Sequence, residues 1–229
     1  MIAISRAQVD RLGERLRKGG VSDDDFRLLD AYRASFAQAY EETINVIRRS
    51  RTQWALTGRP AKSTTSIIEK LRRETIRLSQ VQDIAGCRLV VPDVLTQDRI
   101  VGRLRSTFAK VAVADRRKQP SHGYRAVHLI TTVRNRAIEI QVRTELQHLW
   151  AQLSERLSDT LDPTIKYGGG QSTLPAQRLA ALSRRIAELE EGETQPGGLQ
   201  RVYKLGIKQA FREYLEGAIN QPARLEEKG

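Results

Sequence analysis

Two runs rich in β-branched residues, YRAVHLITTV (124–133) and AIEIQVRT (137–144), are separated only by Arg134-Asn135-Arg136. A connection this short joins neighbouring antiparallel strands, because parallel strands need a long crossover. The chain is therefore predicted to contain an antiparallel β-hairpin, around which the other elements must pack.

Strands and helices alternate on either side of this hairpin. The runs GCRLVV (86–91) and KVAVAD (110–115) are typical of buried strands, and LTQDRIVGRLRSTFA (95–109) between them has the spacing of an amphipathic helix. The segment TELQHLWAQLSERLSD (144–159) predicts another helix directly after the hairpin. This order predicts an α+β domain in which a mixed β-sheet of about five strands is flanked by helices.

Further helices are predicted on both sides of this domain. Ser5 is a suitable cap for a helix that ends at Lys18, and Ser22 begins a new helical pattern that continues to Arg49. A helix is also expected from Ser63 to Leu78, and two more near 175–191 and 199–217, after a loop rich in Gly and Pro. We therefore expect N-terminal helices (1–50), a core (51–167) and a C-terminal helical extension (168–229).

Composition limits the setting and suggests the partners. Cys87 is the single cysteine, and no apolar run approaches the roughly 20 residues that cross a bilayer, so we expect a cytoplasmic protein without disulfides or membrane contact. The 39 Lys and Arg residues against 27 Asp and Glu give a net charge of +12. This excess favours a polyanionic partner such as a nucleotide, RNA or an acidic protein, or it is a solubility charge spread over the surface.

Two acidic residues are candidates for metal binding. Asp83 stands just before the strand GCRLVV, and Glu139 lies within the strand AIEIQVRT. The two-residue period of that strand puts Glu139, Gln141 and Arg143 on one face, opposite the aliphatic residues. If that face lines a cleft with Asp83, two carboxylates are available for Mg²⁺ or for base catalysis; otherwise both acids belong to an ordinary solvated surface.

The helix predicted from Ser63 carries a basic stripe. Lys62, Ser66, Lys70, Arg73 and Arg77 are spaced to share one face near the helix N-terminus. Such a stripe suits a triphosphate, although a solvated basic face has the same pattern. No P-loop, C-x-x-C, H-E-x-x-H or G-x-S-x-G motif is present.

Four motifs together resemble the synthetase domain of the RelA/SpoT family. They are KSTTSIIEKLRRE, QDIAGCRLVV, GYRAVH and EIQVRTELQHLWAQLSERLSD, which follow one another in the family's order and spacing over about residues 59–167. The resemblance implies a nucleotidyltransferase-like synthetase fold. It also implies a pyrophosphokinase that moves the β,γ-pyrophosphate of ATP onto a 3′-hydroxyl, usually of GDP or GTP, and releases AMP.

The resemblance also implies roles for single residues. Asp83 matches the family's Mg²⁺ aspartate, and Glu139 its second acid, which binds metal or deprotonates the 3′-hydroxyl. The residues assigned to ATP are Arg59, Lys62, Ser66, Lys70, Arg73 and Arg88. The residues assigned to the acceptor are Tyr124, which would stack on the base, with Arg125, His128, Gln141 and Arg143. Arg59 and Lys62 enclose two residues here, whereas the family commonly has Arg-x-Lys.

The acceptor loop departs from the pattern of alarmone synthetases, Pro-Lys-x-Asn-Gly-Tyr. Here the loop is Pro120-Ser121-His122-Gly123-Tyr124, which is one residue shorter and lacks the Lys and the Asn expected to read guanine. It resembles the toxic small synthetases of toxin–antitoxin and phage-defence systems, several of which pyrophosphorylate the 3′ end of tRNA.

With no upstream hydrolase module, the chain resembles a stand-alone small synthetase. We therefore expect a toxin that acts on the tRNA 3′ end and has an acidic antitoxin as partner. The alternatives are a (p)ppGpp synthetase of the stringent response, which uses GDP or GTP, and an inactive RNA-binding or regulatory module. The C-terminal helices either pack on the domain or form homo-oligomer contacts.

Overall fold

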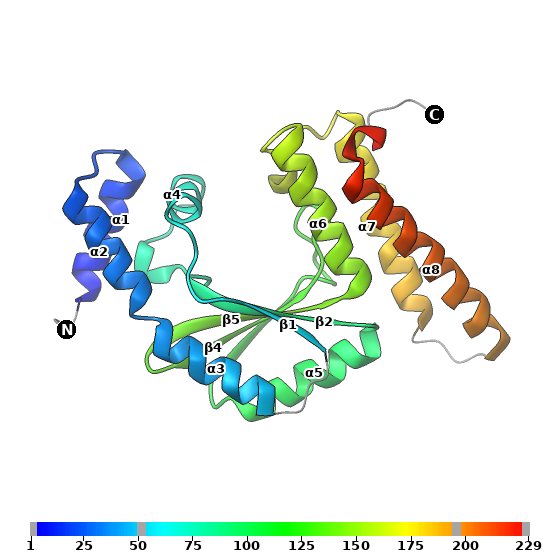
Figure 1. Cartoon of the computed structure of the whole chain (residues 1–229), viewed down its shortest axis with the longest axis horizontal. Helices are drawn as coiled ribbons and strands as arrows, with labels where there is room; N and C mark the ends of the chain where they lie inside the picture. The colour runs from blue at the N-terminus through cyan, green and yellow to red at the C-terminus, as the bar shows by residue number, and fades with distance from the viewer. Residues whose placement is uncertain (1–3, 50–53, 194–197, 226–229) are drawn as a thin grey trace. The chain divides into compact units, whose positions relative to one another are not determined.

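A computed structural model describes residues 4–49, 54–193 and 198–225 (Figure 1). Its β-sheet has the strand order β1-β2-β5-β4-β3. The strands are β1 (Ala55–Arg59), β2 (Ala85–Val91), β3 (Val111–Asp115), β4 (Val127–Val133) and β5 (Arg136–Thr144). The predicted α+β class, with a mixed five-stranded sheet flanked by helices, is confirmed for the described residues.

The predicted hairpin is formed by β4 and β5. Its two turn residues, Arg134 and Asn135, both have left-handed backbone angles, with φ of 48° and 59°. Two such residues make a type I′ turn, whose twist matches that of the strands it joins. Leu129, Ile138 and Ile140 are fully buried, so the apolar face of the hairpin belongs to the core, as the alternation predicted.

The helices agree with the sequence pattern at most of their ends. Ser5 caps the first helix through a capping box, and Gly19 ends it with a φ of 86°. The α-helices are α1 (Arg6–Lys18), α2 (Asp23–Ala34), α3 (Ala37–Arg49), α4 (Thr64–Arg73), α5 (Val94–Thr107), α6 (Glu145–Thr160), α7 (Leu174–Glu193) and α8 (Gly198–Asn220). Short 3₁₀ turns are η1 (Leu78–Gln80), η2 (Ile165–Tyr167) and η3 (Pro222–Leu225).

Helix α4 ends earlier than its sequence predicts. The expected helix from Ser63 to Leu78 stops at Arg73, and Glu74 is extended, with φ −110° and ψ 139°. The cause is a contact from α1, because the guanidinium of Arg17 donates to the carbonyl oxygens of Leu71, at 2.7 Å, and of Ile76. These bonds hold the backbone after α4 away from a helical path. The prediction that Arg77 shares the helix face was therefore wrong.

Two other local features differ from the expectation. The helical pattern that begins at Ser22 is divided into α2 and α3, and the hydroxyl of Ser35 donates to the carbonyl of Tyr32 at the break. Strand β1 was not predicted from the sequence. Four of its five residues are exposed, so it lacks the apolar alternation by which a strand is found. Gly58 lets this strand pass close to the hydroxyl of Tyr40 in α3.

The chain forms two compact units, each with its own core. The first comprises residues 1–88, 107–112 and 129–141. In it α1 packs on α4 and η1, so closely that a Cβ atom added at Gly13 would lie 2.7 Å from Cβ of Leu78. The second unit comprises residues 89–106, 113–128 and 142–229. Its core joins α6, α7, α8 and η3 around Trp150, Leu153 and Leu215.

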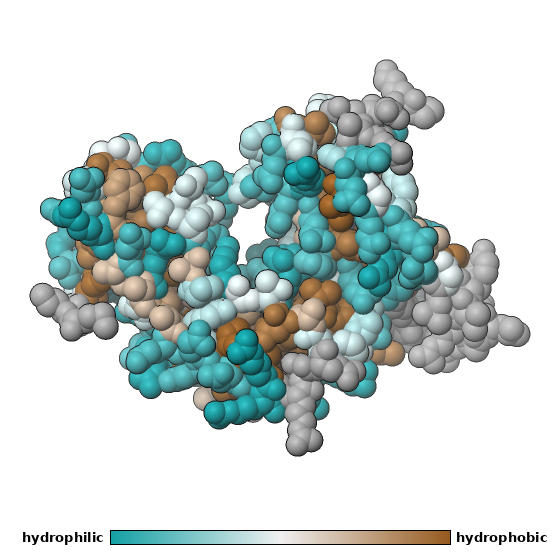
Figure 2. Space-filling model, viewed as in Figure 1, coloured by the Kyte–Doolittle hydropathy of each residue, from teal (hydrophilic) through white to brown (hydrophobic). Residues whose placement is uncertain are grey.

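The visible face is mostly hydrophilic, as the charged residues predict (Figure 2). Among the described residues, no helix combines the length and the apolar character needed to cross a membrane.

Candidate active site

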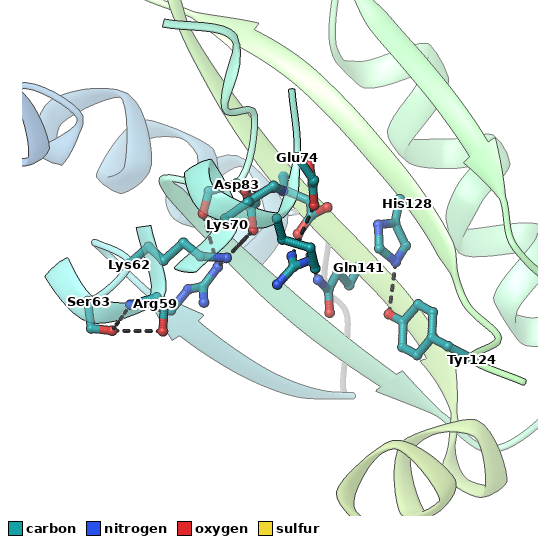
Figure 3. Close-up of polar contacts among 12 residues, drawn as sticks. Arg59, Lys62, Ser63, Lys70, Glu74, Asp83, Tyr124, His128 and Gln141 are labelled. Atoms are coloured by element: carbon teal, nitrogen blue, oxygen red, sulfur yellow. Dashed lines mark hydrogen bonds and ion pairs between the residues drawn. The ribbon is translucent and has the colours of Figure 1, made fainter. Parts of the chain in front are cut away.

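A carboxylate held by two ammonium groups lies at the start of β2. Lys62 Nζ is 2.6 Å from Oδ2 of Asp83, and Lys70 Nζ is 2.8 Å from Oδ1, so each oxygen has its own cation (Figure 3). Between 13% and 20% of each of these three side chains is exposed. Arg59 joins the group, since its guanidinium donates to the carbonyl oxygen of Asp83 at 3.0 Å. The structure thus brings together four residues that the sequence assigned to ATP and metal.

Local structure explains why these side chains meet. The backbone N–H of Lys62 donates to the carbonyl of Ile84 at 2.6 Å, which fixes the chain just before α4 beside the start of β2. Ser63 then caps α4 by accepting from the N–H of Ser66, and the two hydroxyls are 2.8 Å apart. Ile67 is fully buried and anchors the first turns of α4. The N-terminus of α4 therefore lies directly after Lys62, and Lys70 lies further along the same helix.

The charges in this cluster determine the protonation of the carboxylate. Burial alone would raise the pKa of Asp83, but the charges and hydrogen bonds of Lys62 and Lys70 outweigh it and hold that pKa well below its usual range. Burial lowers the pKa of Lys62, although Asp83 opposes that shift. Asp83 is therefore ionised at neutral pH.

The second acid, Glu139, lies on β5, which pairs with β2. Gln141 Nε2 donates to Oε2 of Glu139 at 2.7 Å, which orients the carboxylate. A Cβ atom added at Gly86 would lie 2.5 Å from the carbonyl oxygen of Glu139 and 3.3 Å from its Cβ, so a glycine is needed there. Burial, and then the charge of Glu139, raise the pKa of Cys87 to about 12. In the described part of the chain, no cluster of three or more His, Cys, Asp or Glu side chains is placed to hold a metal ion.

The remaining residues assigned to ATP are placed less closely. Ser66 lies at the capped N-terminus of α4. Arg88 is partly buried in β2, at a position that alternates with the buried Cys87 and Leu89. Arg73 is exposed at the end of α4, and its described ion pair is with the neighbouring Glu74, at 3.0 Å, rather than with Asp83.

A second polar cluster fixes Tyr124. Its hydroxyl is 2.8 Å from Nε2 of His128, and Arg143 donates to the same hydroxyl from Nη2 at 2.8 Å and from Nε at 3.2 Å. Figure 3 shows the bond between Tyr124 and His128. The guanidinium of Arg143, which is 4% exposed, also lies 4.9 Å from the centroid of the Tyr124 ring. Three of the residues assigned to the acceptor are thus in direct contact.

Tyr124 itself closes a tight turn and does not begin the predicted strand. The N–H of Tyr124 donates to the carbonyl of Ser121 at 2.9 Å, and the central residues His122 and Gly123 have φ of 53° and 87°. Strand β4 begins only at Val127, three residues later than predicted.

The side chain of Arg125 binds a different set of partners from the Tyr124 hydroxyl. Its guanidinium donates to the carbonyl of Arg117 at 2.6 Å and to the hydroxyl of Ser183 at 3.2 Å. No pattern in the sequence pointed to Ser183, which lies 58 residues from Arg125 along the chain.

Comparison with known sequences identifies a family region. A family model described as "Region found in RelA / SpoT proteins" matches residues 58–158. An uncharacterized protein of Mycobacterium tuberculosis is 34% identical over 170 residues, which is 71% of this chain and 62% of that protein. The chain thus spans less than two thirds of the length of the curated relatives that it matches.

Solved structures share the fold. The small alarmone synthetase 1 from Bacillus subtilis is 25% identical, with a TM-score of 0.54, over 74% of this chain and 94% of that one. The protein smu.1046c from Streptococcus mutans UA159 is 26% identical, with a TM-score of 0.54, over 81% of this chain and 98% of that one.

Proposed function

Because residues 58–158 match the region found in RelA/SpoT proteins, we propose that the protein is an ATP-dependent pyrophosphokinase that acts on a 3′-hydroxyl group. The observation that carries this proposal is the Asp83 cluster. A buried carboxylate with one lysine on each oxygen, next to a capped helix N-terminus, combines a metal ligand with cations for phosphate. Transfer of a phosphoryl or pyrophosphoryl group depends mainly on such positioning and charge neutralisation.

In the proposed reaction, Lys62, Lys70 and the N-terminus of α4 bind the triphosphate of ATP. The acceptor 3′-oxygen attacks the β-phosphorus, the bond between the β-phosphorus and the α-β bridging oxygen breaks, and AMP leaves. Glu139, oriented by Gln141, takes the proton of the hydroxyl group.

Asp83 and Glu139 also fit the role of Mg²⁺ ligands. Mg²⁺ is usually held by one or two carboxylates together with substrate phosphates. Asp83 lies just before β2 and Glu139 lies on β5, the strand that pairs with β2. When bound, the ion would neutralise charge across the phosphates.

The Tyr124 cluster is proposed to bind the acceptor. His128 and Arg143 fix the hydroxyl of Tyr124, so its ring has a set orientation. Stacking of a base on an aromatic ring contributes about 1–3 kcal/mol and accepts any base. Glu139, Gln141 and Arg143 alternate along β5, so this strand carries both the proposed base and an acceptor residue.

We favour the 3′ end of tRNA as acceptor. The net charge of +12 suits a polyanion, and the short loop from Pro120 to Tyr124 has stacking but neither Lys nor Asn for reading guanine. The test is transfer of ³²P from γ-labelled ATP to tRNA, GDP and GTP in parallel, with the double variant Asp83→Asn/Glu139→Gln as control. Label in tRNA supports the preference, and label only in GDP or GTP contradicts it.

GDP or GTP is the second candidate acceptor. It is favoured by the 25% identity to a small alarmone synthetase that aligns over 94% of that protein's length. The same assay decides between the two. If no acceptor is labelled and the double variant keeps every binding property and phenotype, an inactive RNA-binding module replaces both proposals.

A toxic enzyme also needs a neutralising partner. We propose an acidic antitoxin protein, because an acidic surface complements the basic excess of this chain. Expression of this chain alone should arrest growth, and harmless expression of the active enzyme would contradict this role. Light scattering would show whether the C-terminal helices form a homo-oligomer instead.

A further inference from the structure

The turn that carries Tyr124 is held by helix α7. The hydroxyl of Ser183, a residue only 3% exposed, donates to the carbonyl oxygen of Gly123 at 2.6 Å and accepts from Nε of Arg125 at 3.2 Å. Gly123 and Arg125 are the two neighbours of Tyr124 in the chain. One hydroxyl group therefore fixes the backbone and the side chain on either side of the proposed acceptor-binding residue.

The turn that accepts this hydrogen bond is closely packed. A Cβ atom at Gly123 would lie 2.8 Å from Cζ2 of Trp150 and 3.3 Å from Cβ of Ser183, so the turn is enclosed by α6 and α7. The space bounded by these residues, Arg125, Gln147 and Ile186 has no volume for a water molecule. Removal of the Ser183 hydroxyl would therefore leave the carbonyl of Gly123 without this donor.

Helix α7 also contacts the strand end that carries Arg143. Glu190, which is 6% exposed, accepts hydrogen bonds from the hydroxyl of Thr144 and, at 2.9 Å, from Nε2 of Gln147. Thr144 directly follows Arg143, the donor to the hydroxyl of Tyr124, and it caps α6. Helix α7 thus contacts both the turn that ends at Tyr124 and the segment next to Arg143, which donates to the Tyr124 hydroxyl.

We propose that Ser183 is a positioning residue that sets the orientation of Tyr124, so that α7 forms part of the acceptor-binding site. The consequence for acceptor binding rests on the proposed function. The consequence for the turn itself does not. Lys62 and Lys70, the proposed ATP ligands, belong to the other compact unit, so ATP binding serves as the internal reference.

The test compares Ser183→Ala with Ser158→Ala. Ser158 is also buried, at 2% exposed, and its hydroxyl accepts from the N–H of Lys166 at 3.1 Å, so the control removes an equivalent hydroxyl from the same unit. The first measurement is hydrogen exchange of the Tyr124 amide, which should be about tenfold faster in Ser183→Ala than in the wild type or the control. The second is KM, which should rise about five- to tenfold for the acceptor and stay constant for ATP.

The outcomes separate this inference from the proposed function. If the wild type transfers no pyrophosphate, the proposed function fails, and the exchange rate alone decides whether Ser183 holds the turn. The inference would be overturned if the Tyr124 amide exchanged at the wild-type rate in Ser183→Ala, or if its exchange were accelerated equally in Ser158→Ala. A parallel rise of both KM values would do the same.

Discussion

Replacement of Asp83 by Asn tests the central cluster most directly, because it removes one charge and keeps the shape of the side chain. Lys62 and Lys70 then lose their anionic partner at 2.6 and 2.8 Å, and one of them faces an amide donor instead of an oxygen. Breaking a buried ion pair from one side costs about 3–5 kcal/mol. Between 13% and 20% of each of these side chains is exposed, so they are not fully buried. We therefore expect a loss at the lower end of this range, about 3 kcal/mol of unfolding free energy.

The pH dependence of this loss follows from the lowered pKa of Asp83. A carboxyl group whose pKa is lower in the folded state contributes stability above its unfolded pKa, about 3.9, and loses that contribution as the pH falls toward the folded value. The difference in unfolding free energy between wild type and Asp83→Asn should therefore be constant from about pH 5 to 8. It should shrink only below about pH 4.

Asp30→Asn is the matched control. Asp30 pairs with Arg33 at 2.8 Å, the same distance as between Lys70 and Asp83, but 65% of its side chain is exposed. An exposed pair contributes about 0–1 kcal/mol, so this variant should change little. Thermal unfolding measures both, and a loss of about 3 kcal/mol lowers Tm by about 6–12 °C in a chain of this size. The reasoning is refuted if Asp83→Asn is no more destabilising than the control, or if its effect varies between pH 5 and 8.

Three further variants test neighbouring features. Gly86→Ala should destabilise the protein by about 1–3 kcal/mol, because the new methyl group meets the backbone of Glu139. Gly102→Ala, on a helix with no atom near the new methyl group, should stabilise the protein by about 0.5–1 kcal/mol. Equal changes of Tm in the two variants would contradict this reasoning. Tyr124→Phe should raise the acceptor KM several-fold at constant ATP KM, and an unchanged acceptor KM would show that the fixed hydroxyl is irrelevant. Cys87, with a pKa of about 12, should resist alkylation at pH 8 until the protein unfolds, and rapid labelling of the native protein would contradict its burial.

The features predicted from sequence are those that depend on neighbours along the chain. The hairpin turn at Arg134-Asn135 and the helix starts at Ser5 and Ser22 were found because turns and caps are set within a few residues. The approach of Lys62 and Lys70 to Asp83 came from motif resemblance, since their spacing alone also fitted a solvated basic face. The structure adds the contacts that bring them together.

The features that were missed depend on contacts between distant segments. Helix α4 ends at Arg73, where Arg17, from a helix more than 50 residues away, binds the carbonyl of Leu71 in the last turn and that of Ile76 beyond it. Strand β1 is exposed and lacks alternation, so its pairing with β2 is set by the sheet rather than by its own residues. In both cases tertiary contacts override local preference, and a single sequence does not reveal them.

The glycine run from Gly168 to Gly170 shows how one pattern can have two meanings. By composition it indicates a loop that leads to the C-terminal helices, and its backbone is indeed left-handed at Gly168, with a φ of 82°. A Cβ atom at Gly168 would lie 2.0 Å from Cδ2 of His122, the residue with positive φ in the acceptor turn. Gly168 therefore also provides the space in which the His122 ring rests. The turn before Tyr124 is thus in contact with Gly168 through His122 and with Ser183 through Gly123, so segments far along the chain from this turn help to shape the proposed acceptor site.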